Sequence, residues 1–450
     1  MRALLRSRMR IDRLELQNFR GFERFAIDLD PNFTLLLGRN GAGKTAVLEA
    51  LAVAVGEWFT GLKQVAGQTR YLKDEDVRQV GHISEGVPSI ETVYPVKVTA
   101  QGEVVEGQSV TWTRHILALG KRARSVGGTP VSGRAESLEE AVVLGEEVDL
   151  PVICFYGTAR LSLKKRDRED ASVTSRLHGY YASLDPASST WQFEAWMQWR
   201  EQVRIERLAT SIKLGVESPS LVEEPQLEAV QRAAATCLPG AKRLYFSLNT
   251  KSVLVDLEDG RTLPFNLLSD GYRNLVALAA DLAWRCVQLN PHHGAHAPQL
   301  ARGIVLIDEI DLHLHPNWQR RVIGDLRKTF PGVQFVATTH SPQVLSTAND
   351  AWVRLLVPRE PEPRRVSHVK GKDTNALLED IFGEPSRPPD MQKELDRLAQ
   401  FIDEAQLGEA RKLLLALREK LGADDSDIVR AEWAVRDLED DQRADDHEGR

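Results

Sequence analysis

The chain has 450 residues, room for about three domains, of which 42% are hydrophobic and 27% charged. This composition is that of an ordinary globular protein and excludes bulk disorder and fibrous repeats. The 58 basic and 65 acidic residues leave a net charge of −7, which is too mild to predict a polyanion-binding protein from charge alone.

Cysteine usage and hydropathy predict a cytoplasmic protein without a membrane anchor. Cys154, Cys237 and Cys286 are far apart, which favours free thiols in a reducing compartment over disulfides or a cysteine zinc site. The longest apolar run, near residues 275–284, is far shorter than the ~18 residues that span a bilayer. The start, MRALLRSRMR, lacks a signal-peptide core, and we interpret it as a leader, with Met9 as an alternative start.

The N-terminal part of the chain has the pattern of an α/β protein. Apolar and polar residues alternate over residues 11–16 and 25–29, which predicts an antiparallel hairpin. Residues 33–37 are continuously apolar and lead into a glycine-rich segment, after which residues 45–59 have helical periodicity. This order predicts a buried strand, a loop and a helix.

Two further stretches in this part predict strands. Alternation over residues 93–112, with Gly102 and Gly107 as turn residues, predicts an antiparallel meander. Residues 120–150 predict a loop with one exposed helix, and residues 152–156 predict a buried strand. We therefore expect a mixed sheet.

A polar segment of helical period, from residue 164 to about 238, predicts a helical insertion. Its mixed charge run, residues 164–170, is interpreted as a solvated face, with a nucleic-acid contact as the alternative. Four aromatic residues at helical spacing favour a packing stripe over a base-stacking platform. They are Trp191, Phe193, Trp196 and Trp199.

The second half of the chain returns to an α/β pattern. Alternation resumes over residues 244–257, and residues 303–308 and 334–338 predict two strands flanking an amphipathic helix that starts near Pro316. Three helical stretches and an acidic tail follow. The helical stretches are residues 390–404, 407–421 and 425–439.

These patterns predict a head of the α/β class, with a mixed sheet, a helical insertion and a helical C-terminal module. The module's helices have apolar faces that must bury against either the head or a partner protein. The predicted parts are the N-terminal half of the head (1–162), the insertion (163–240), the C-terminal half of the head (241–362) and the module with its acidic tail (363–450).

Residues 38–45, GRNGAGKT, match the GxxxxGK[ST] phosphate loop between a predicted strand and a predicted helix. Glycines let backbone N–H groups face phosphates at a helix N-terminus, Lys44 can neutralise phosphate oxygens, and Thr45 can bind Mg²⁺. We therefore predict ATP and Mg²⁺ as cofactors and disfavour a glycine-rich turn without a ligand. The predicted ATP-binding residues in this loop are Asn40, Gly41, Ala42, Gly43, Lys44 and Thr45.

Acidic residues and a histidine follow two of the predicted strands. The strand over residues 303–308 ends in Asp308 and Glu309, at the edge where α/β sheets bind ligands. We predict that Thr45 ligates Mg²⁺, that Asp308 holds the ion through water, and that Glu309 orients the attacking water. His340 follows the next strand, so Glu309 and His340 are the predicted catalytic residues. An acidic helix cap and a structural histidine are the alternatives.

Ser269 and Gly271, in LSDGYRN, precede a strongly apolar helix whose N-terminus can face a phosphate, although alone they indicate only a helix cap. With the phosphate loop, the Asp–Glu pair and THSP, in that order, the chain resembles the ABC-type ATPase head of SMC-like and RecF-like proteins. LSDGYRN stands for the LSGGQ-like signature, from which Asp270 and Tyr272 depart. The resemblance implies that the signature completes the site of a second copy, in a head-to-tail homodimer or a higher even oligomer.

The chain also resembles the PtuA-type ATPases of Septu anti-phage systems and retron-associated ATPases. The resemblance extends to the C-terminal run GKDTNALLEDIFGEPSRP. It implies a cytosolic ATPase whose partner is a separately encoded HNH nuclease, and it implies that nucleic acid is contacted through the complex of the two. It also implies that His313 and His315 have a structural role and do not bind zinc. The other motifs that carry it are NFRGFE, GRNGAGKTAVLEALA, YGTARL, LSDGYRN, IDEIDLHLHPNWQR and TTHSPQVL.

Other candidate sites in the sequence are weak. His292, His293 and His296 lie in a Pro/Gly loop and are expected to be exposed, because no cysteine or acid completes a metal site nearby in the sequence. No HNH or DxD-type nuclease pattern follows His340, and no sustained heptads predict a long coiled coil.

We therefore predict an ABC-like ATPase that uses MgATP to regulate a partner nuclease in an anti-phage complex. The alternative is a RecF-like DNA-repair ATPase that acts on DNA without a nuclease partner. A third hypothesis, a pseudo-ATPase that only binds nucleotide, is disfavoured by the presence of Glu309.

Overall fold

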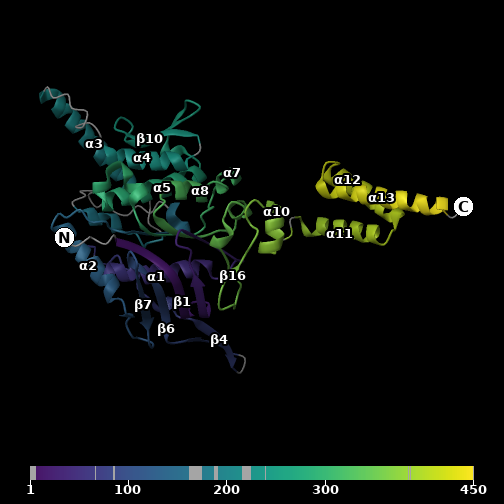
Figure 1. Cartoon of the computed structure of the whole chain (residues 1–450), viewed down its shortest axis with the longest axis horizontal. Coiled ribbons are helices and arrows are strands. Elements are labelled where there is room, and N and C mark those ends of the chain that lie inside the picture. The colour runs from purple at the N-terminus through teal and green to yellow at the C-terminus, as the bar shows by residue number, and fades with distance from the viewer. Residues whose placement is uncertain are drawn as a thin grey trace. The chain divides into compact units, whose positions relative to one another are not determined.

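The computed structural model describes residues 7–448 except residues 66, 85–86, 162–174, 187–190, 215–223, 239, 384 and 386. The chain divides into a larger unit, Met1–Lys372, and a smaller unit, Asp373–Arg450. The larger unit contains every strand of the described residues, whereas the smaller unit is helical (Figure 1). The charge run over residues 164–170 lies outside the described residues.

The centre of the larger unit is a six-stranded sheet that is parallel except at one edge. Its order is β16-β15-β3-β14-β13-β9, and only β16 is antiparallel to its neighbour. Every residue of β3, β9, β13 and β14 is buried, as expected where a parallel sheet is covered on both faces. The strands are β3 (Phe33–Leu37), β9 (Val152–Tyr156), β13 (Gly303–Ile307), β14 (Val333–Thr338), β15 (Val353–Leu355) and β16 (Arg364–Arg365).

A second, five-stranded antiparallel sheet has the order β2-β1-β6-β7-β8. The predicted hairpin and meander form strands of this sheet. Because the chain combines it with the largely parallel sheet and with helices, the predicted mixed α/β fold is confirmed. The strands of the antiparallel sheet are β1 (Ser7–Phe19), β2 (Phe22–Asp28), β6 (Val96–Val105), β7 (Gln108–Ile116) and β8 (Arg124–Val126). Two smaller sheets pair β4 (Gln79–Ser84) with β5 (Val87–Thr92), and β10 (Ala241–Ser247) with β11 (Ser252–Leu257) and β12 (Thr262–Pro264).

Three local predictions in this region are wrong. Gly102 lies inside β6 rather than in a turn, because a Cβ there would come within 1.9 Å of the Arg10 carbonyl oxygen on β1. Residues 7–10, the described part of the segment interpreted as a leader, belong to β1, and Met9 is fully buried. The helix expected to be exposed, α2 (Thr129–Val143), packs on α1 and buries one face.

Helix α1 (Lys44–Thr60) contacts strands of both large sheets, which is why it is apolar on nearly all sides. Helix α5 (Asp270–Leu289) packs on β9, α3 (Trp191–Leu214) and α4 (Pro225–Cys237), on the side away from β1 and β6 (Figure 1). Phe193 and Trp196 of α3 are buried, which confirms packing at these two positions. The remaining short helices are α6 (Ala297–Leu300), α7 (Pro316–Gln319), α8 (Val322–Thr329) and α9 (Pro342–Leu345).

The smaller unit has a hydrophobic core of its own. After α10 (Thr374–Leu377) and a π-helical turn (Leu378–Phe382), three helices pack their apolar faces against one another around Leu398, Leu414 and Leu417. The helices are α11 (Pro389–Asp403), α12 (Leu407–Leu421) and α13 (Ser426–Glu448), and the last continues through most of the predicted acidic tail. In the described part of the chain, no helix is both long and apolar enough to cross a membrane.

Candidate nucleotide-binding site

The phosphate loop connects β3 to α1 in a conformation that depends on glycine. Gly38 and Gly43 have φ angles of 148° and 95°, in the left-handed region that disfavours other residues. A Cβ at Gly38 would lie 2.6 Å from the Leu356 carbonyl oxygen, and one at Gly43 would lie 2.4 Å from the ring of Phe22. The loop is therefore held between β2 and the segment after β15, with the N-terminus of α1 at its end.

Lys44 folds back over this loop. Its Nζ atom donates hydrogen bonds to the carbonyl oxygens of Gly38, at 2.8 Å, and Arg39, at 3.2 Å. Burial lowers the pKa of Lys44, while Asp308 and Glu309 act in the opposite direction. An ammonium group held partly out of water beside glycine amides is suited to bind phosphate oxygens.

Asp308 joins the ends of three elements. Its Oδ2 atom accepts a hydrogen bond from the Thr45 hydroxyl at 3.0 Å, and its Oδ1 atom accepts one from the Thr338 hydroxyl at 2.6 Å. The Thr338 hydroxyl in turn accepts a hydrogen bond from the backbone N–H of Glu309 at 2.8 Å. The ends of β13 and β14 are thereby fixed against the start of α1.

The Thr45–Asp308 pair fits magnesium. Mg²⁺ prefers oxygen ligands at about 2.0–2.1 Å in octahedral geometry, so two adjacent ligands lie roughly 2.9 Å apart. The hydroxyl and carboxylate oxygens here are 3.0 Å apart, on the wall of the same cavity as Lys44. These two residues could therefore hold the ion without a large movement.

The cavity at this junction has a volume of about 250 Å³. It is smaller than the roughly 300–1,000 Å³ of pockets that enclose whole ligands, which suits phosphate groups rather than an entire nucleotide. Its wall contains Asn40, Gly41, Gly43, Lys44, Thr45, Ala46, Asp308, Glu309, Thr338 and His340. Ala42 is buried in the loop and is not part of the wall.

Glu309 and His340 meet in this cavity, from the ends of neighbouring strands. Glu309 has a φ angle of 48°, an uncommon backbone conformation that clusters at functional sites. Burial lowers the pKa of His340, and the positive charge of Lys44 lowers it further. The imidazole is therefore neutral at neutral pH and can donate one hydrogen bond without adding charge.

Arg160 is a residue whose role the sequence did not reveal, although it stands in the YGTARL motif. It is 3% exposed and donates hydrogen bonds to the carbonyl oxygens of Asp308, at 2.7 Å, and Glu309, at 2.8 Å. Its Nε atom donates to Asn274 Oδ1 on α5 at 2.6 Å. Burial lowers the pKa of Arg160 to about 10, so it stays protonated at neutral pH. Arg160 thus links the start of α5 to the Asp–Glu pair.

The signature residues lie outside this cavity. Ser269 is the N-cap of α5 and is exposed, and its side chain makes no capping hydrogen bond. Gly271 is buried, where a Cβ would lie 2.3 Å from the carbonyl oxygen of His313. Tyr272, one of the two departures, packs edge-on against Trp318 with ring centroids 4.1 Å apart. Within one chain the structure therefore does not bring Ser269 and Gly271 to the phosphate loop.

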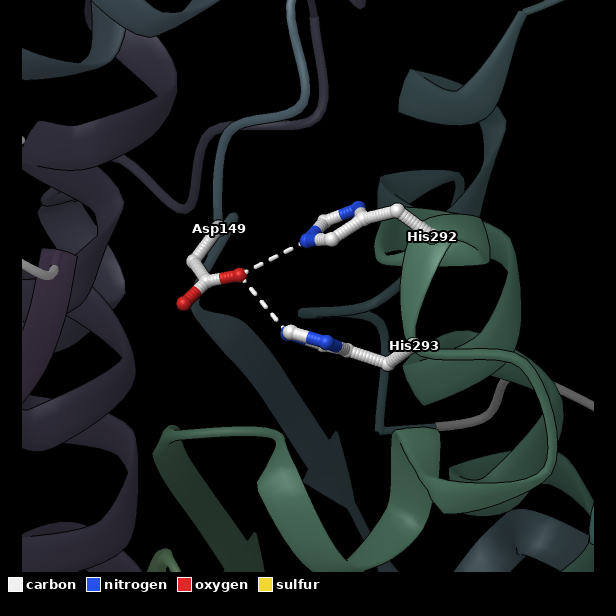
Figure 2. Close-up of side chains that lie close together, drawn as sticks. All are labelled: Asp149, His292 and His293. Atoms are coloured by element: carbon white, nitrogen blue, oxygen red, sulfur yellow. Dashed lines mark hydrogen bonds and ion pairs between the residues drawn. The ribbon is translucent and has the colours of Figure 1, made fainter.

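The histidine predictions have mixed outcomes. His313 is exposed, and the Nδ1 atom of His315 caps α7 by accepting a hydrogen bond from the Asn317 N–H at 3.4 Å. The predicted exposure of His292 and His293 is wrong, because their side chains are only 13% and 21% exposed, whereas His296 is exposed as predicted. Asp149, far away in the sequence, lies within hydrogen-bond distance of both rings (Figure 2).

The fold and the site define a P-loop ATPase-type head of the α/β class. A family model described as "AAA domain" matches residues 13–222, and one described as "AAA domain, putative AbiEii toxin, Type IV TA system" matches residues 167–346. Among solved structures, the chain is similar to the SMC head domain from Thermotoga maritima, with a TM-score of 0.43 and 16% identity over 80% of this chain and 98% of that chain.

The chain is similar to retron ATPases and to Septu proteins over most of its length. It is 26% identical to the Retron Ec83 probable ATPase of Escherichia coli, over 94% of this chain and 85% of the relative. It is 23% identical to the Septu protein PtuA of Bacillus mycoides (strain KBAB4), over 89% of this chain and 49% of that protein. This similarity confirms the predicted resemblance to Septu and retron ATPases.

Proposed function

We propose that this chain hydrolyses MgATP and that its nucleotide state controls a separately encoded HNH nuclease in an anti-phage complex. The observation that carries the ATPase part is the junction at which Asp308 bonds Thr45 and Thr338 beside Lys44. This cavity brings together oxygen ligands for a metal ion, the positive charge of Lys44 and the acidic side chains at the end of β13. Phosphoryl transfer requires these groups.

The loop amides and five side chains of the cavity have proposed roles. Lys44 and the loop amides bind the β- and γ-phosphates, and Thr45 and Asp308 hold Mg²⁺, which neutralises phosphate charge when bound. Glu309 accepts a hydrogen bond from the attacking water and orients it toward the γ-phosphate. Neutral His340 donates a hydrogen bond to the same phosphate.

Equilibrium binding of ATP in the presence of Mg²⁺ tests the assignment of the site. Lys44→Ala removes the charge that faces the phosphates and should weaken binding at least tenfold. Lys63→Ala removes an exposed lysine that pairs with Glu136 and should leave binding unchanged. Equal affinities for the two variants would contradict the assignment.

The head-to-tail dimer is a second part of the proposal. Ser269 and Asp270 are exposed at the N-terminus of α5, and Leu267 beside them is 71% exposed, an apolar side chain at the surface. Because this helix start does not line its own phosphate cavity, it is available to the cavity of a second copy. Two nucleotides would then lie at the dimer interface.

The smaller unit is the proposed docking site for the nuclease. It has its own core, and the described residues that line the phosphate cavity all belong to the larger unit. Trp433 is 67% exposed on α13, and exposed tryptophans are frequent anchors of protein interfaces. The relationship to the Septu protein PtuA supports a partner in a defence system.

Co-purification with the HNH protein tests this docking. Deleting residues 390–450 should abolish capture of the nuclease while ATP binding and dimerisation persist. Full capture by the truncated chain would place the docking site elsewhere. Strongly salt-dependent DNA binding by the isolated chain, with no effect of the nuclease, would instead favour the RecF-like alternative.

A further inference from the structure

A second cluster of functional side chains lies at the opposite end of α5 from the signature. Asp149 stands in the segment before β9, and His292 and His293 stand in the 3₁₀ turn Pro291–His296 that follows α5. Asp149 Oδ1 lies 2.9 Å from His292 Nε2 and 2.7 Å from His293 Nε2. Asp149 is more than 140 positions away from the two histidines in the sequence, yet the three side chains lie together in the structure (Figure 2).

The backbone around the cluster is held in place on both sides. Asn290, directly before the turn, accepts a hydrogen bond from the Leu150 N–H at 2.8 Å and donates one to the Leu150 carbonyl oxygen at 3.0 Å. Arg176 donates to the carbonyl oxygen of Val148 and to that of Leu289. These contacts fix the end of α5 against the start of β9, so the positions of the three side chains do not depend on their own hydrogen bonds alone.

The two imidazoles use the same nitrogen toward the same oxygen. Figure 2 shows both rings pointing at Oδ1 of Asp149, while Oδ2 points away from them. The other ring nitrogen of His292, Nδ1, is buried without a hydrogen-bond partner among the described residues. The three potential ligand atoms, one from each side chain, all lie within 4.8 Å of one another, close enough for all of them to reach one metal ion.

We propose that Asp149, His292 and His293 form a binding site for a divalent transition metal, with zinc the ion that this ligand set fits best. Two imidazoles and one carboxylate are a ligand set that zinc takes with water in the fourth position. Ligands at about 2.0–2.1 Å from a tetrahedral zinc lie roughly 3.3 Å apart. The observed hydrogen bonds are shorter than this, so the side chains would separate by a few tenths of an ångström to admit the ion.

The accessibility of the cluster suits binding of an ion from solution. The side chains are 32%, 13% and 21% exposed at Asp149, His292 and His293, which leaves a path for the ion. The bound ion would cross-link the end of α5 to the start of β9.

Metal titration of the untagged full-length chain tests the site. After treatment with a chelator, the chain should bind one equivalent of Zn²⁺, and Co²⁺ should give the visible absorption of a tetrahedral site. His292→Gln and His293→Gln should each weaken Zn²⁺ binding at least tenfold, because each removes a ligand. His296→Gln changes an exposed histidine of the same turn and should bind as the parent does.

Thermal unfolding provides a second measurement that does not depend on catalysis. Zn²⁺ should raise the unfolding temperature of the parent and of His296→Gln but not that of His292→Gln or His293→Gln. Circular dichroism of the metal-free chains shows whether each variant folds. Less than a tenth of an equivalent of Zn²⁺ on the parent, or equal binding by parent and both ligand variants, would overturn the proposal.

Discussion

The charge state of His340 is set by its surroundings in the phosphate cavity. Burial and Lys44 both lower its pKa, against the smaller opposing influence of Asp311, Glu309 and Asp308. By linkage, a histidine whose folded-state pKa is lowered destabilises the fold as pH falls below its unfolded value of about 6.5. At neutral pH the ring is uncharged and contributes no such penalty.

We expect nuclear magnetic resonance titration of the nucleotide-free chain to find the pKa of His340 below the usual histidine value of about 6.5. Lys44→Met should raise the pKa of His340, because it removes a positive charge that opposes protonation. In the parent chain, MgATP should also raise the pKa of His340, because it brings negative phosphate charge into the cavity. A pKa of His340 that is unchanged in Lys44→Met would show that the two side chains do not share the cavity.

Arg160 acts through the backbone of the Asp–Glu pair rather than on the nucleotide, which makes it a positioning residue. Arg160→Lys should lower kcat at least tenfold while changing ATP affinity less than threefold, because the carbonyl oxygens of Asp308 and Glu309 lose donors that fix Glu309. Steady-state phosphate release and equilibrium binding separate the two effects.

A matched change controls for lost stability. Arg176 donates to the carbonyl oxygens of Leu289 and Val148 at the other end of α5, and Arg176→Lys should reduce stability without lowering kcat. If both variants lower kcat equally, the effect of Arg160 is a general loss of structure.

At the scale of elements, the start of α5 is the part assigned to a second copy of the chain. Ser269→Arg should prevent ATP-dependent dimerisation of the Glu309→Gln protein, because the bulky side chain occupies the exposed helix N-terminus, yet leave ATP binding intact. Ser109→Arg, at an exposed serine on β7, should still dimerise. Light scattering with MgATP measures both. Dimerisation of the Ser269→Arg protein would contradict the assignment.

The core of the smaller unit gives a prediction for stability. Leu417 is fully buried on α12, and Leu417→Ala should destabilise α11, α12 and α13 by about 2–5 kcal/mol, the usual loss for a large core side chain. Leu415, on the same helix, is 64% exposed, and Leu415→Ala should change stability by less than about 0.5 kcal/mol. Hydrogen exchange in the full chain reports on these helices separately. Equal exchange rates in the two variants would contradict the packing.

Elements with a local signal were predictable from the sequence. β3 and β9 begin and end where predicted, because a continuous apolar run bounded by glycine or proline is a strong signal of a buried strand. Gly102 was misassigned because a glycine that permits close approach of two strands has the same local pattern as a turn. Helices and strands were therefore easier to predict than the structural role of an individual glycine.

Contacts between distant segments left no sequence signal. Asp149 meets His292 and His293, and Arg160 meets Asp308, only because β9, α5 and β13 are neighbours in the folded chain. The motif residues, in contrast, could be predicted to lie close together. Lys44, Asp308, Glu309 and His340 each stand at the end of a predicted strand or the start of a helix, and parallel strands bring such ends to one edge.

At the scale of the whole molecule, the chain consists of an ATPase-type head and a helical unit with a separate core. We assign ATP chemistry to the head and partner binding to the helical unit. We therefore expect that the two functions can be separated by mutation. This separation has meaning only if the head turns over ATP by the proposed residues.

The most direct test is the rate of phosphate release from MgATP by the parent and by Glu309→Gln. The substitution keeps the shape of the side chain but removes the carboxylate that orients water, so turnover should fall by about 10²–10⁴-fold while ATP binding is retained. Hydrolysis by Glu309→Gln at the parental rate would contradict the central claim, because Glu309 would then not be the residue that activates the attacking water.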